Sequence, residues 1–352
     1  MRARVGSVFA KPPRLRIGDT VAAISVSSGL PALLPHRYAA GKRQIEETFG
    51  VTVIETPNAL KDPDWLYRNP RARADDLHWA LENPEVRAIF STIGGNESVR
   101  ILPHVNSGII RKHPKIMMGS SDTTIALTAF VRAGVVAFYG PPVMGDLAEN
   151  CGIRPFVKES VRAALFEAEP SRIEFQAAEE WSEEFLEWGD PSLASRARKF
   201  VPSEGWQWLQ GGARASGRLV GGCLDVLEFL KGTPWWIPKK LWDGAIFVAE
   251  TSEEAPPPTT VSYWLRNYGS QGILQRLSGM LVARPMRYTR EMTDSLYKEI
   301  RRVLAEFGRE DLPVVANLDF GHTSPQMVVP LGCRAQIDPE ARRIALLESP
   351  VA

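Results

Sequence analysis

Three short loops carry the residue types that could do chemistry in this chain. The first is GSSDTT, residues 119–124, which stands between an expected strand and an expected helix. A serine at a sharp strand-to-helix turn presents its hydroxyl clear of the sheet, and the free N–H groups that open the helix can stabilise an oxyanion. Ser121 is therefore a candidate nucleophile. Ser, Asp and Thr are also common helix N-caps, so the local pattern leaves plain capping open.

The second loop is TIGGN, residues 92–96, at the end of the preceding expected strand. In a parallel sheet its backbone would lie beside Ser121 and could supply a second oxyanion donor, with a simple glycine turn as the alternative. The loop lacks the full G-x-G-x-x-G spacing, and the chain has no GxxxxGK[ST] motif. Both absences disfavour a dinucleotide or nucleotide-triphosphate enzyme.

The third loop contains the best-placed histidine of the chain. Histidine is scarce, with five residues at positions 36, 78, 104, 113 and 322. The first four stand at a helix start, in a helical pattern, after a proline and in a basic surface run. His322 instead lies in a Gly-His-Thr-Ser-Pro loop between two apolar strands, where a side chain faces a cleft. It is the candidate general base, although a structural histidine is the alternative.

Glu250 ends the apolar run AIFVAE and is the candidate acid. A carboxylate at the mouth of a buried strand must be paired, because burying it alone costs on the order of several kcal/mol. Orienting an imidazole would satisfy it. We expect Glu253 and Glu254 to be solvated loop residues. The order Ser121, Glu250, His322 repeats the nucleophile, acid and base arrangement found on unrelated folds.

Composition narrows the classes of partner and compartment. No HExxH, CxxC or histidine pair at helical spacing occurs, so we expect neither a metal site nor a cofactor. With 42 Lys and Arg against 41 Asp and Glu, the net charge of +1 argues against nucleic acid as a partner. Cys151, Cys223 and Cys333 are odd in number and far apart, which is typical of thiols in a reducing compartment. No apolar run suits export or membrane insertion, so the cytoplasm is expected.

The elements that must position these loops predict an α/β protein. Over the first half of the 352 residues, short β-branched runs alternate with amphipathic stretches, the pattern of βαβ units in a parallel sheet. Expected strands are residues 20–26, 51–55, 86–92, 115–118 and 135–139, and expected helices are 35–49, 71–80 and 123–133. In the second half, expected strands are 245–250, 280–283, 314–318, 326–330 and 343–348, and expected helices are 263–276 and 291–307.

The composition changes over residues 167–208, which are rich in Glu and hold four tryptophans with weak periodicity. We place an interdomain Trp-rich insertion there, between an N-terminal domain at 1–166 and a C-terminal domain at 209–352. The expected architecture is an N-terminal parallel-sheet α/β domain with a nucleophile elbow and a smaller C-terminal mixed α/β domain.

Several motifs, in order along most of the chain, resemble the LD-carboxypeptidase family of serine peptidases. They are RIGDTVAAISVSSG, RARADDLHWAL, STIGGNES, GSSDTT, FYGP, GGCLDVL, AETSEEAPP and GHTSPQMVVPLG. The resemblance implies that the N-terminal domain carries the nucleophile Ser121 and that the C-terminal domain carries the acid Glu250 and the base His322. It implies an oxyanion hole from the amides of Gly95 and Asp122, and a substrate site that includes Gly94 and Cys223.

Two departures from the family pattern bear on substrate preference. Ser120 stands where the family commonly has an aromatic residue, which makes that wall of the pocket smaller and more polar. Cys223 stands where many relatives carry Asn, so a side-chain amide contact to substrate is missing.

Within the family, the segment EEWSEEFLEWGD at residues 179–190 resembles the microcin C self-immunity peptidases. The resemblance implies that Trp181 and Trp188 clamp the adenine of a substrate, and stacking on a base is worth ~1 to 3 kcal/mol. The alternative is that their seven-residue spacing places both rings on one face of a helix, packed into the core.

The resemblance implies a serine amidase that hydrolyses the amide between an aminoacyl or peptidyl group and a nucleotide analogue of the microcin C type. That reaction would detoxify an inhibitor of aminoacyl-tRNA synthetases. The first alternative is an LD-carboxypeptidase that releases D-alanine from a murein tetrapeptide, against which the tryptophan insertion argues. The second is a non-catalytic binding protein in which Ser121 only caps a helix. A homodimer is expected from the resemblance.

Overall fold

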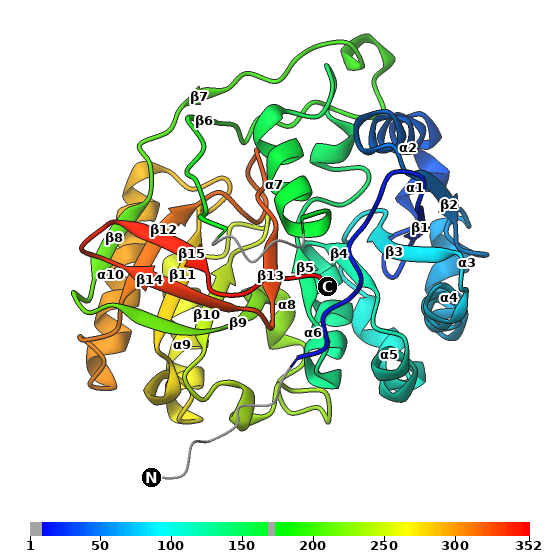
Figure 1. Ribbon diagram of the computed structural model, residues 1–352. Helices are drawn as coiled ribbons and strands as arrows, with labels where there is room; N and C mark the ends of the chain where they lie inside the picture. The colour runs from blue at the N-terminus through cyan, green and yellow to red at the C-terminus, as the bar shows by residue number, and fades with distance from the viewer. Residues whose placement is uncertain (1–8, 168–172) are drawn as a thin grey trace.

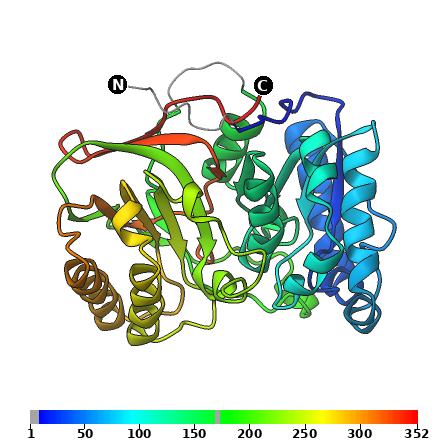
Figure 2. The same cartoon turned by 90° about the horizontal axis from the view of Figure 1, so that it is seen from below.

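The computed structural model describes residues 9–167 and 173–352. It contains a six-stranded sheet, a seven-stranded sheet and a two-stranded ribbon. Figures 1 and 2 show the two larger sheets beside each other, with helices packed on both. The predicted α/β class is confirmed, with a mostly parallel N-terminal sheet and a mixed, curled C-terminal sheet. Residues 1–8 of the predicted N-terminal domain and 168–172 of the predicted insertion lie outside the described residues.

The N-terminal sheet has the strand order β13-β5-β4-β3-β1-β2. Five strands are parallel: β1 (Thr20–Ile24), β2 (Thr52–Glu55), β3 (Val86–Ser91), β4 (Ile116–Gly119) and β5 (Ala137–Tyr139). The connecting helices include α2 (Pro35–Phe49), α4 (Pro70–Glu82), α5 (Ser107–Lys112) and α6 (Thr124–Ala133), followed by α7 (Pro155–Leu165). All residues of β4 and β5 are buried, as expected for parallel strands covered on both faces.

The C-terminal sheet has the order β15-β14-β9-β10-β11-β12-β8. Strands β9 (Ala215–Cys223), β10 (Ile246–Glu250), β11 (Gly279–Ala283) and β12 (Val314–Leu318) are parallel. Strands β8 (Gln207–Gln210), β14 (Arg334–Asp338) and β15 (Arg343–Leu346) pair antiparallel with their neighbours. Helices α9 (Pro258–Ser270) and α10 (Arg290–Glu306) pack on each other along this sheet.

Helix α6 lies between the two sheets (Figure 1) and contacts β4 and β5 on one side and β9 and α8 (Leu224–Glu228) on the other. Nine of its ten residues are buried, and its sequence is apolar on nearly all sides, which is the expected pattern for a helix buried all round. The N-terminus of α6, where GSSDTT ends, is therefore held where both sheets can contribute residues.

The segment after β12 joins the two sheets. Strand β12 belongs to the C-terminal sheet, whereas β13 (Val329–Leu331) pairs antiparallel with β5 at the edge of the N-terminal sheet. Strand β13 starts three residues after the predicted start of its strand at 326. The loop that carries His322 lies in this crossing, so its position depends on both sheets.

The predicted helix at 263–276 has the wrong bounds. Helix α9 starts at Pro258, because a proline is well suited to the first turn, and it ends at Ser270. Gly272 follows with φ +74°, a left-handed conformation that stops a helix, and a separate 3-10 turn covers Leu274–Arg276. The prediction also omitted α7 and the strands β8 and β14.

The described part of the insertion runs over the top of the molecule in Figure 1. Its only paired strands within residues 173–206 are β6 (Glu180–Trp181) and β7 (Val201–Pro202), which are antiparallel. Trp181 lies in β6 and Trp188 in a loop, so the alternative that both share one helix face is wrong. Within the described residues, no helix has the length and apolar character needed to cross a membrane.

Candidate active site

Ser121 occupies the strand-to-helix turn that its sequence predicts. Strand β4 ends at Gly119, a 3-10 turn covers Ser121–Thr123, and α6 follows directly. The φ of Ser121 is +56°, a left-handed value that is uncommon for a residue with a side chain and costs on the order of 1–3 kcal/mol. Such strain is typical of a nucleophile elbow, because it turns the hydroxyl away from the sheet and helix backbone.

The TIGGN loop lies against this serine, as the parallel sheet predicts. A Cβ on Gly94 would lie 2.8 Å from the Cβ and 2.9 Å from the Oγ of Ser121, so only glycine fits there. Gly95 has φ +143° and also packs too closely against Ser27 to carry a side chain. Among the described residues, the backbone N–H groups of Gly95 and Asp122 have no hydrogen-bond acceptor. Both can therefore donate to a ligand.

The Asp122 side chain has a separate, structural contact. One carboxylate oxygen accepts the backbone N–H of Ser98 at 2.7 Å, and the Asp122 carbonyl accepts the Ser98 hydroxyl at 2.7 Å. These bonds tie the elbow to the segment that follows TIGGN. Neither bond uses the backbone N–H of Asp122, which stays free to donate near Ser121.

Glu250 and His322 contact each other across the two chain segments that the sequence singled out. His322 Nδ1 lies 2.8 Å from Glu250 Oε2, at the end of β10. Glu250 is 1% exposed, and its pairing with an imidazole is the arrangement expected for a buried carboxylate. Gly321, with φ +94°, permits the approach, because a Cβ there would lie 3.0 Å from Glu250 Cδ.

Tyr139 is a site residue that the sequence reasoning missed. Its hydroxyl accepts the backbone N–H of Ser121 at 2.9 Å and donates to Glu250 Oε1, so it connects Ser121 with Glu250. Burial, followed by the charge of Glu250, raises the pKa of Tyr139 well above its ordinary value, which keeps the phenol neutral and able to donate. The signal was available in FYGP: a tyrosine that ends a buried strand needs a partner for its hydroxyl.

The second ring nitrogen of His322 faces another carboxylate. His322 Nε2 lies 2.9 Å from Glu253 Oε2, within the distance of an ion pair. Among the described residues, no group forms a well-directed hydrogen bond with Nε2, and this includes Ser121. Burial lowers the pKa of His322, but Glu250 and Glu253 outweigh it and raise the pKa to about 10. The contact with His322 in turn lowers the pKa of Glu253 to about 2. Glu253 is exposed, as expected, but it is also part of the site, which corrects its interpretation as a purely solvated loop residue. Glu254 is exposed, as expected.

A cavity of about 500 Å³ opens over these residues. Its lining includes Gly94, Gly95, Ser120, Ser121 and His322 from segments that follow strands, and residues 183–188 from the insertion. In this lining, the ring of Trp188 is 5.4 Å from that of Phe185 and stacks under the guanidinium of Arg37 at 4.6 Å.

Four of the predicted site residues do not line this cavity: Glu250, which is buried behind His322, and Trp181, Cys223 and Asp122. Trp181 stacks with Arg284 at 4.9 Å, away from Trp188. Cys223 is buried at the end of β9, where its N–H donates to Thr124 Oγ1 at 3.1 Å. Asp122 is fully buried beside Ser121. The substrate roles of Trp181 and Cys223 and the oxyanion role of the Asp122 amide stay predictions.

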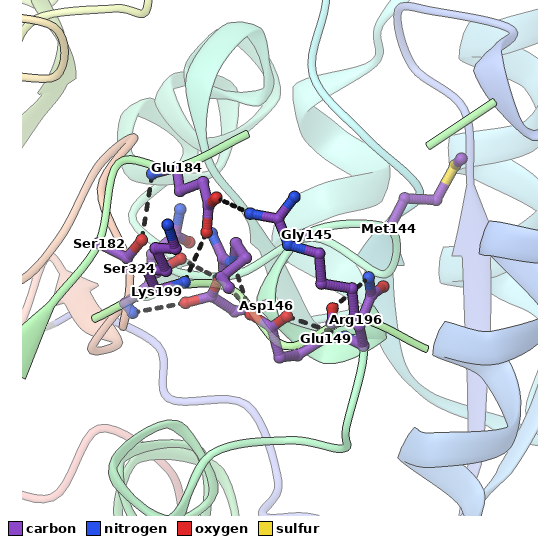
Figure 3. Close-up of polar contacts among 12 residues, drawn as sticks. Met144, Gly145, Asp146, Glu149, Ser182, Glu184, Arg196, Lys199 and Ser324 are labelled. Carbon is purple, nitrogen blue, oxygen red and sulfur yellow. Dashed lines mark hydrogen bonds and ion pairs between the residues drawn. The ribbon is translucent and has the colours of Figure 1, made fainter. Parts of the chain in front are cut away.

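The insertion is anchored to the His322 loop through one buried carboxylate, a connection that the sequence did not reveal. Arg198 contacts Asp146 at 2.9 Å and Glu149 at 2.7 Å. Asp146 also accepts the N–H of Gln326 at 2.8 Å and the hydroxyl of Ser324. Figure 3 shows Asp146 and Ser324 beside the insertion residues Ser182, Glu184 and Lys199. Asp146 therefore holds both the insertion, which lines the cavity, and the loop that carries His322. No group of three or more His, Cys, Asp or Glu in the described ranges is arranged to hold a metal ion.

Comparison with known proteins identifies the lineage of this site. The family model for the LD-carboxypeptidase N-terminal domain matches residues 21–140, and the model for the C-terminal domain matches residues 216–337. The chain belongs to the LD-carboxypeptidase family. Members of this family are serine peptidases, so the protein is a hydrolase by descent.

Relatives in the family are described with two different functions. The probable murein peptide carboxypeptidase of Bacillus subtilis (strain 168) is 29% identical over 353 residues, which covers 99% of this chain and 97% of its own. The microcin C7 self-immunity protein MccF of Escherichia coli is 24% identical over 338 residues, covering 95% and 94%. A MccF-like protein from Streptococcus pneumoniae, solved in complex with AMP, is 26% identical with a TM-score of 0.81, covering 94% and 98%.

Proposed function

We propose that this protein is a serine amidase that cleaves an aminoacyl or peptidyl group from a nucleotide analogue of the microcin C type. The observation that carries the proposal is a single cavity of about 500 Å³ lined both by Ser121 and His322 and by the aromatic pair Phe185 and Trp188. Volumes of ~300 to 1,000 Å³ suit small-molecule ligands. The AMP held by the 26% identical S. pneumoniae protein supports a nucleotide as part of that ligand.

In the proposed reaction, Ser121 Oγ attacks the amide carbonyl carbon while His322 Nε2 takes the hydroxyl proton. Glu250 holds the ring through Nδ1 and stabilises the imidazolium, and Tyr139 holds Glu250. The C–N bond then breaks, the leaving nitrogen receives the proton from His322, and water hydrolyses the acyl-enzyme ester. The product would no longer inhibit an aminoacyl-tRNA synthetase, so the activity would confer self-immunity.

The oxyanion of the intermediate would be stabilised by the free N–H groups of Gly95 and Asp122. Each donor of this kind is worth ~10² to 10³ in rate in other acyl-transfer enzymes. The close packing of Gly94 on Ser121 fixes the distance between the donors and the nucleophile.

Trp188 is the better placed of the two predicted adenine-stacking residues. It lines the cavity, and Arg37 already covers one of its faces at 4.6 Å. A purine that stacks on Trp188 would gain ~1 to 3 kcal/mol. Trp181 would have to leave Arg284 to take part.

A second candidate function is release of D-alanine from a murein tetrapeptide by the same chemistry. The 29% identity with the B. subtilis protein over nearly the whole chain favours it. Its cleavage site would occupy the same Ser121 and His322, and the insertion would cover a peptide rather than a base. A non-catalytic binding role and a homodimeric state stay predictions.

The test is incubation of the purified protein with aminoacyl sulfamoyl adenosines and with murein tetrapeptide, followed by mass spectrometry. Release of sulfamoyl adenosine by the wild type, and not by Ser121→Ala, is the expected result. Release of D-alanine only would replace the proposal with the murein activity. Equal ligand binding and no cleavage by either protein would favour the binding role.

A further inference from the structure

The cavity carries an excess of negative charge. Six carboxylate side chains line it against three guanidiniums, and the carboxylates are Asp146, Glu149, Glu183, Glu184, Glu187 and Glu253. Arg198 forms ion pairs with the first two, and Arg196, outside the lining, pairs with Glu184. The oxygens of Glu183 and Glu187 accept backbone N–H groups instead of facing a cation. Such a lining favours a positively charged group on the ligand.

Glu253 is the carboxylate of this set that touches the reaction centre. Its Oε2 lies 2.9 Å from His322 Nε2, and its side chain is 48% exposed. The backbone beside it is fixed: its carbonyl accepts from Arg287 at 3.1 Å, and the preceding Ser252 is held by Asp225 through its N–H and hydroxyl. The main chain is thus anchored, while the side chain has room to turn into the cavity.

This contact competes with catalysis. Nε2 is the atom that must take the proton from Ser121, and in the free protein it faces Glu253 instead, without a hydrogen bond to Ser121. The carboxylate has to give up this contact before the reaction starts. A cationic group on the substrate offers it an alternative partner, whereas a neutral substrate offers none.

We propose that Glu253 is a specificity-determining residue, which selects acyl groups with an ammonium near the scissile carbonyl and frees His322 when that ammonium replaces the imidazole as its partner. The inference rests on the proposed function and names the class of acyl group that it takes. The ammonium can be a free α-amino group or that of a basic side chain, and the experiment below separates the two.

The electrostatics around His322 agree with this assignment. The groups that face it are Glu250 from β10, Glu253 from the loop that follows, and Tyr139 from β5 behind Glu250, with Arg287 beside Glu253. Burial lowers the pKa of His322, but the two carboxylates raise it to about 10, so the free enzyme holds a protonated ring at pH 7. A substrate ammonium that engages Glu253 removes one of the two causes of the raised pKa and favours the neutral form of His322.

The test compares wild type with Glu253→Gln, using Glu254→Gln as the matched control. Glu254 is the next residue, is exposed and does not line the cavity, so the control removes the same charge without the contact. The substrates are alanyl, N-acetylalanyl and N-acetyllysyl sulfamoyl adenosine. Alanyl against N-acetylalanyl reports on the α-ammonium, and N-acetyllysyl against N-acetylalanyl reports on a side-chain ammonium.

For wild type and Glu254→Gln, we expect kcat/KM to be about tenfold to a hundredfold higher for at least one cationic substrate than for N-acetylalanyl sulfamoyl adenosine. This is the range for a hydrogen bond to a charged group. Glu253→Gln should bring that preference close to unity. It should also move the rise of kcat/KM for N-acetylalanyl substrate to lower pH, a shift that a purely structural role would not produce. Equal preferences in wild type and Glu253→Gln would overturn the inference and leave the proposed function intact.

Binding separates this inference from a failure of the proposed function. Affinities for the same three ligands are measured by calorimetry with Ser121→Ala and with the double variant Ser121→Ala, Glu253→Gln. If wild type hydrolyses none of the ligands, the proposed function fails, yet a cation preference lost in the double variant still supports the role of Glu253. If Ser121→Ala and the double variant bind each ligand with equal affinity, or if neither binds any of the ligands, the role of Glu253 is overturned. Thermal unfolding of each variant checks that the fold is kept.

Discussion

Replacement of Tyr139 by phenylalanine tests whether one buried hydroxyl couples Ser121 to Glu250. The ring volume is kept, so only the hydroxyl contacts are lost. The hydroxyl accepts from the Ser121 N–H at 2.9 Å and donates to Glu250, which is 1% exposed. Without the hydroxyl, one oxygen of a buried carboxylate and the Ser121 N–H each lose a hydrogen-bond partner.

The magnitude follows from these two contacts. A hydrogen bond to a charged group contributes about 1.5–3 kcal/mol and a neutral one about 0.5–1.5 kcal/mol, so we expect a loss of about 2–4.5 kcal/mol in stability. If about half of that is felt by the Glu250–His322 pair in the transition state, kcat/KM falls about fivefold to fiftyfold. Scanning calorimetry measures the first effect and hydrolysis of an aminoacyl sulfamoyl adenosine the second.

Tyr268 provides the matched control. It is also fully buried, but its hydroxyl has no hydrogen-bond partner among the described residues. Tyr268→Phe removes an unsatisfied polar group, so its unfolding temperature should stay the same or rise, with unchanged kcat/KM. The reasoning is refuted if the two substitutions have the same effect, or if Tyr139→Phe lowers stability and leaves kcat/KM at the wild-type value.

Three further outcomes are expected. Gly94→Ala should lower kcat/KM at least about a hundredfold with an unchanged circular dichroism spectrum, because the new Cβ would lie 2.9 Å from Ser121 Oγ; retention of activity would contradict the packing. Trp188→Ala should raise KM for the nucleotide substrate about tenfold or more, whereas Trp181→Ala, outside the cavity lining, should have a smaller effect; the reverse order would support the predicted role of Trp181. The pKa of His322 is raised from 6.5 to about 10, so its charge contributes stability that is complete below pH 6.5 and is lost as pH rises through 10. The difference in unfolding temperature between wild type and His322→Gln should therefore shrink as pH rises over that window. A difference that grows would contradict this prediction.

Local sequence signals predicted the elements that they alone determine. Helix α2 has the predicted bounds, because Pro35 suits the first turn and Gly50 takes the left-handed conformation at the end. The strands of the N-terminal sheet were found because parallel strands read as continuous apolar runs. The pairing of Glu250 with His322 was also predictable, since a carboxylate at the end of a buried strand requires a partner.

What the sequence left out depends on tertiary contacts. No local sequence pattern predicts that β13 pairs with β5, because the two strands lie almost 200 residues apart in the chain. Glu253 reads as a solvated loop residue until the crossing from β12 to β13 brings His322 to it. The insertion has weak periodicity because its course is held by ion pairs such as Arg198 with Asp146 and by few buried side chains.

The same crossing makes the assembly of the site a property of the whole fold. Ser121 and Tyr139 belong to the N-terminal sheet, Glu250 belongs to the C-terminal sheet, and the His322 loop ends in β13, which returns to the N-terminal sheet. A movement of one sheet against the other would stretch the Tyr139–Glu250 bond and the His322 loop together, because both cross the same boundary. The charge relations of His322 therefore depend on how closely the two sheets pack, and a substitution that loosens α6 between them should act on catalysis even where it touches no site residue.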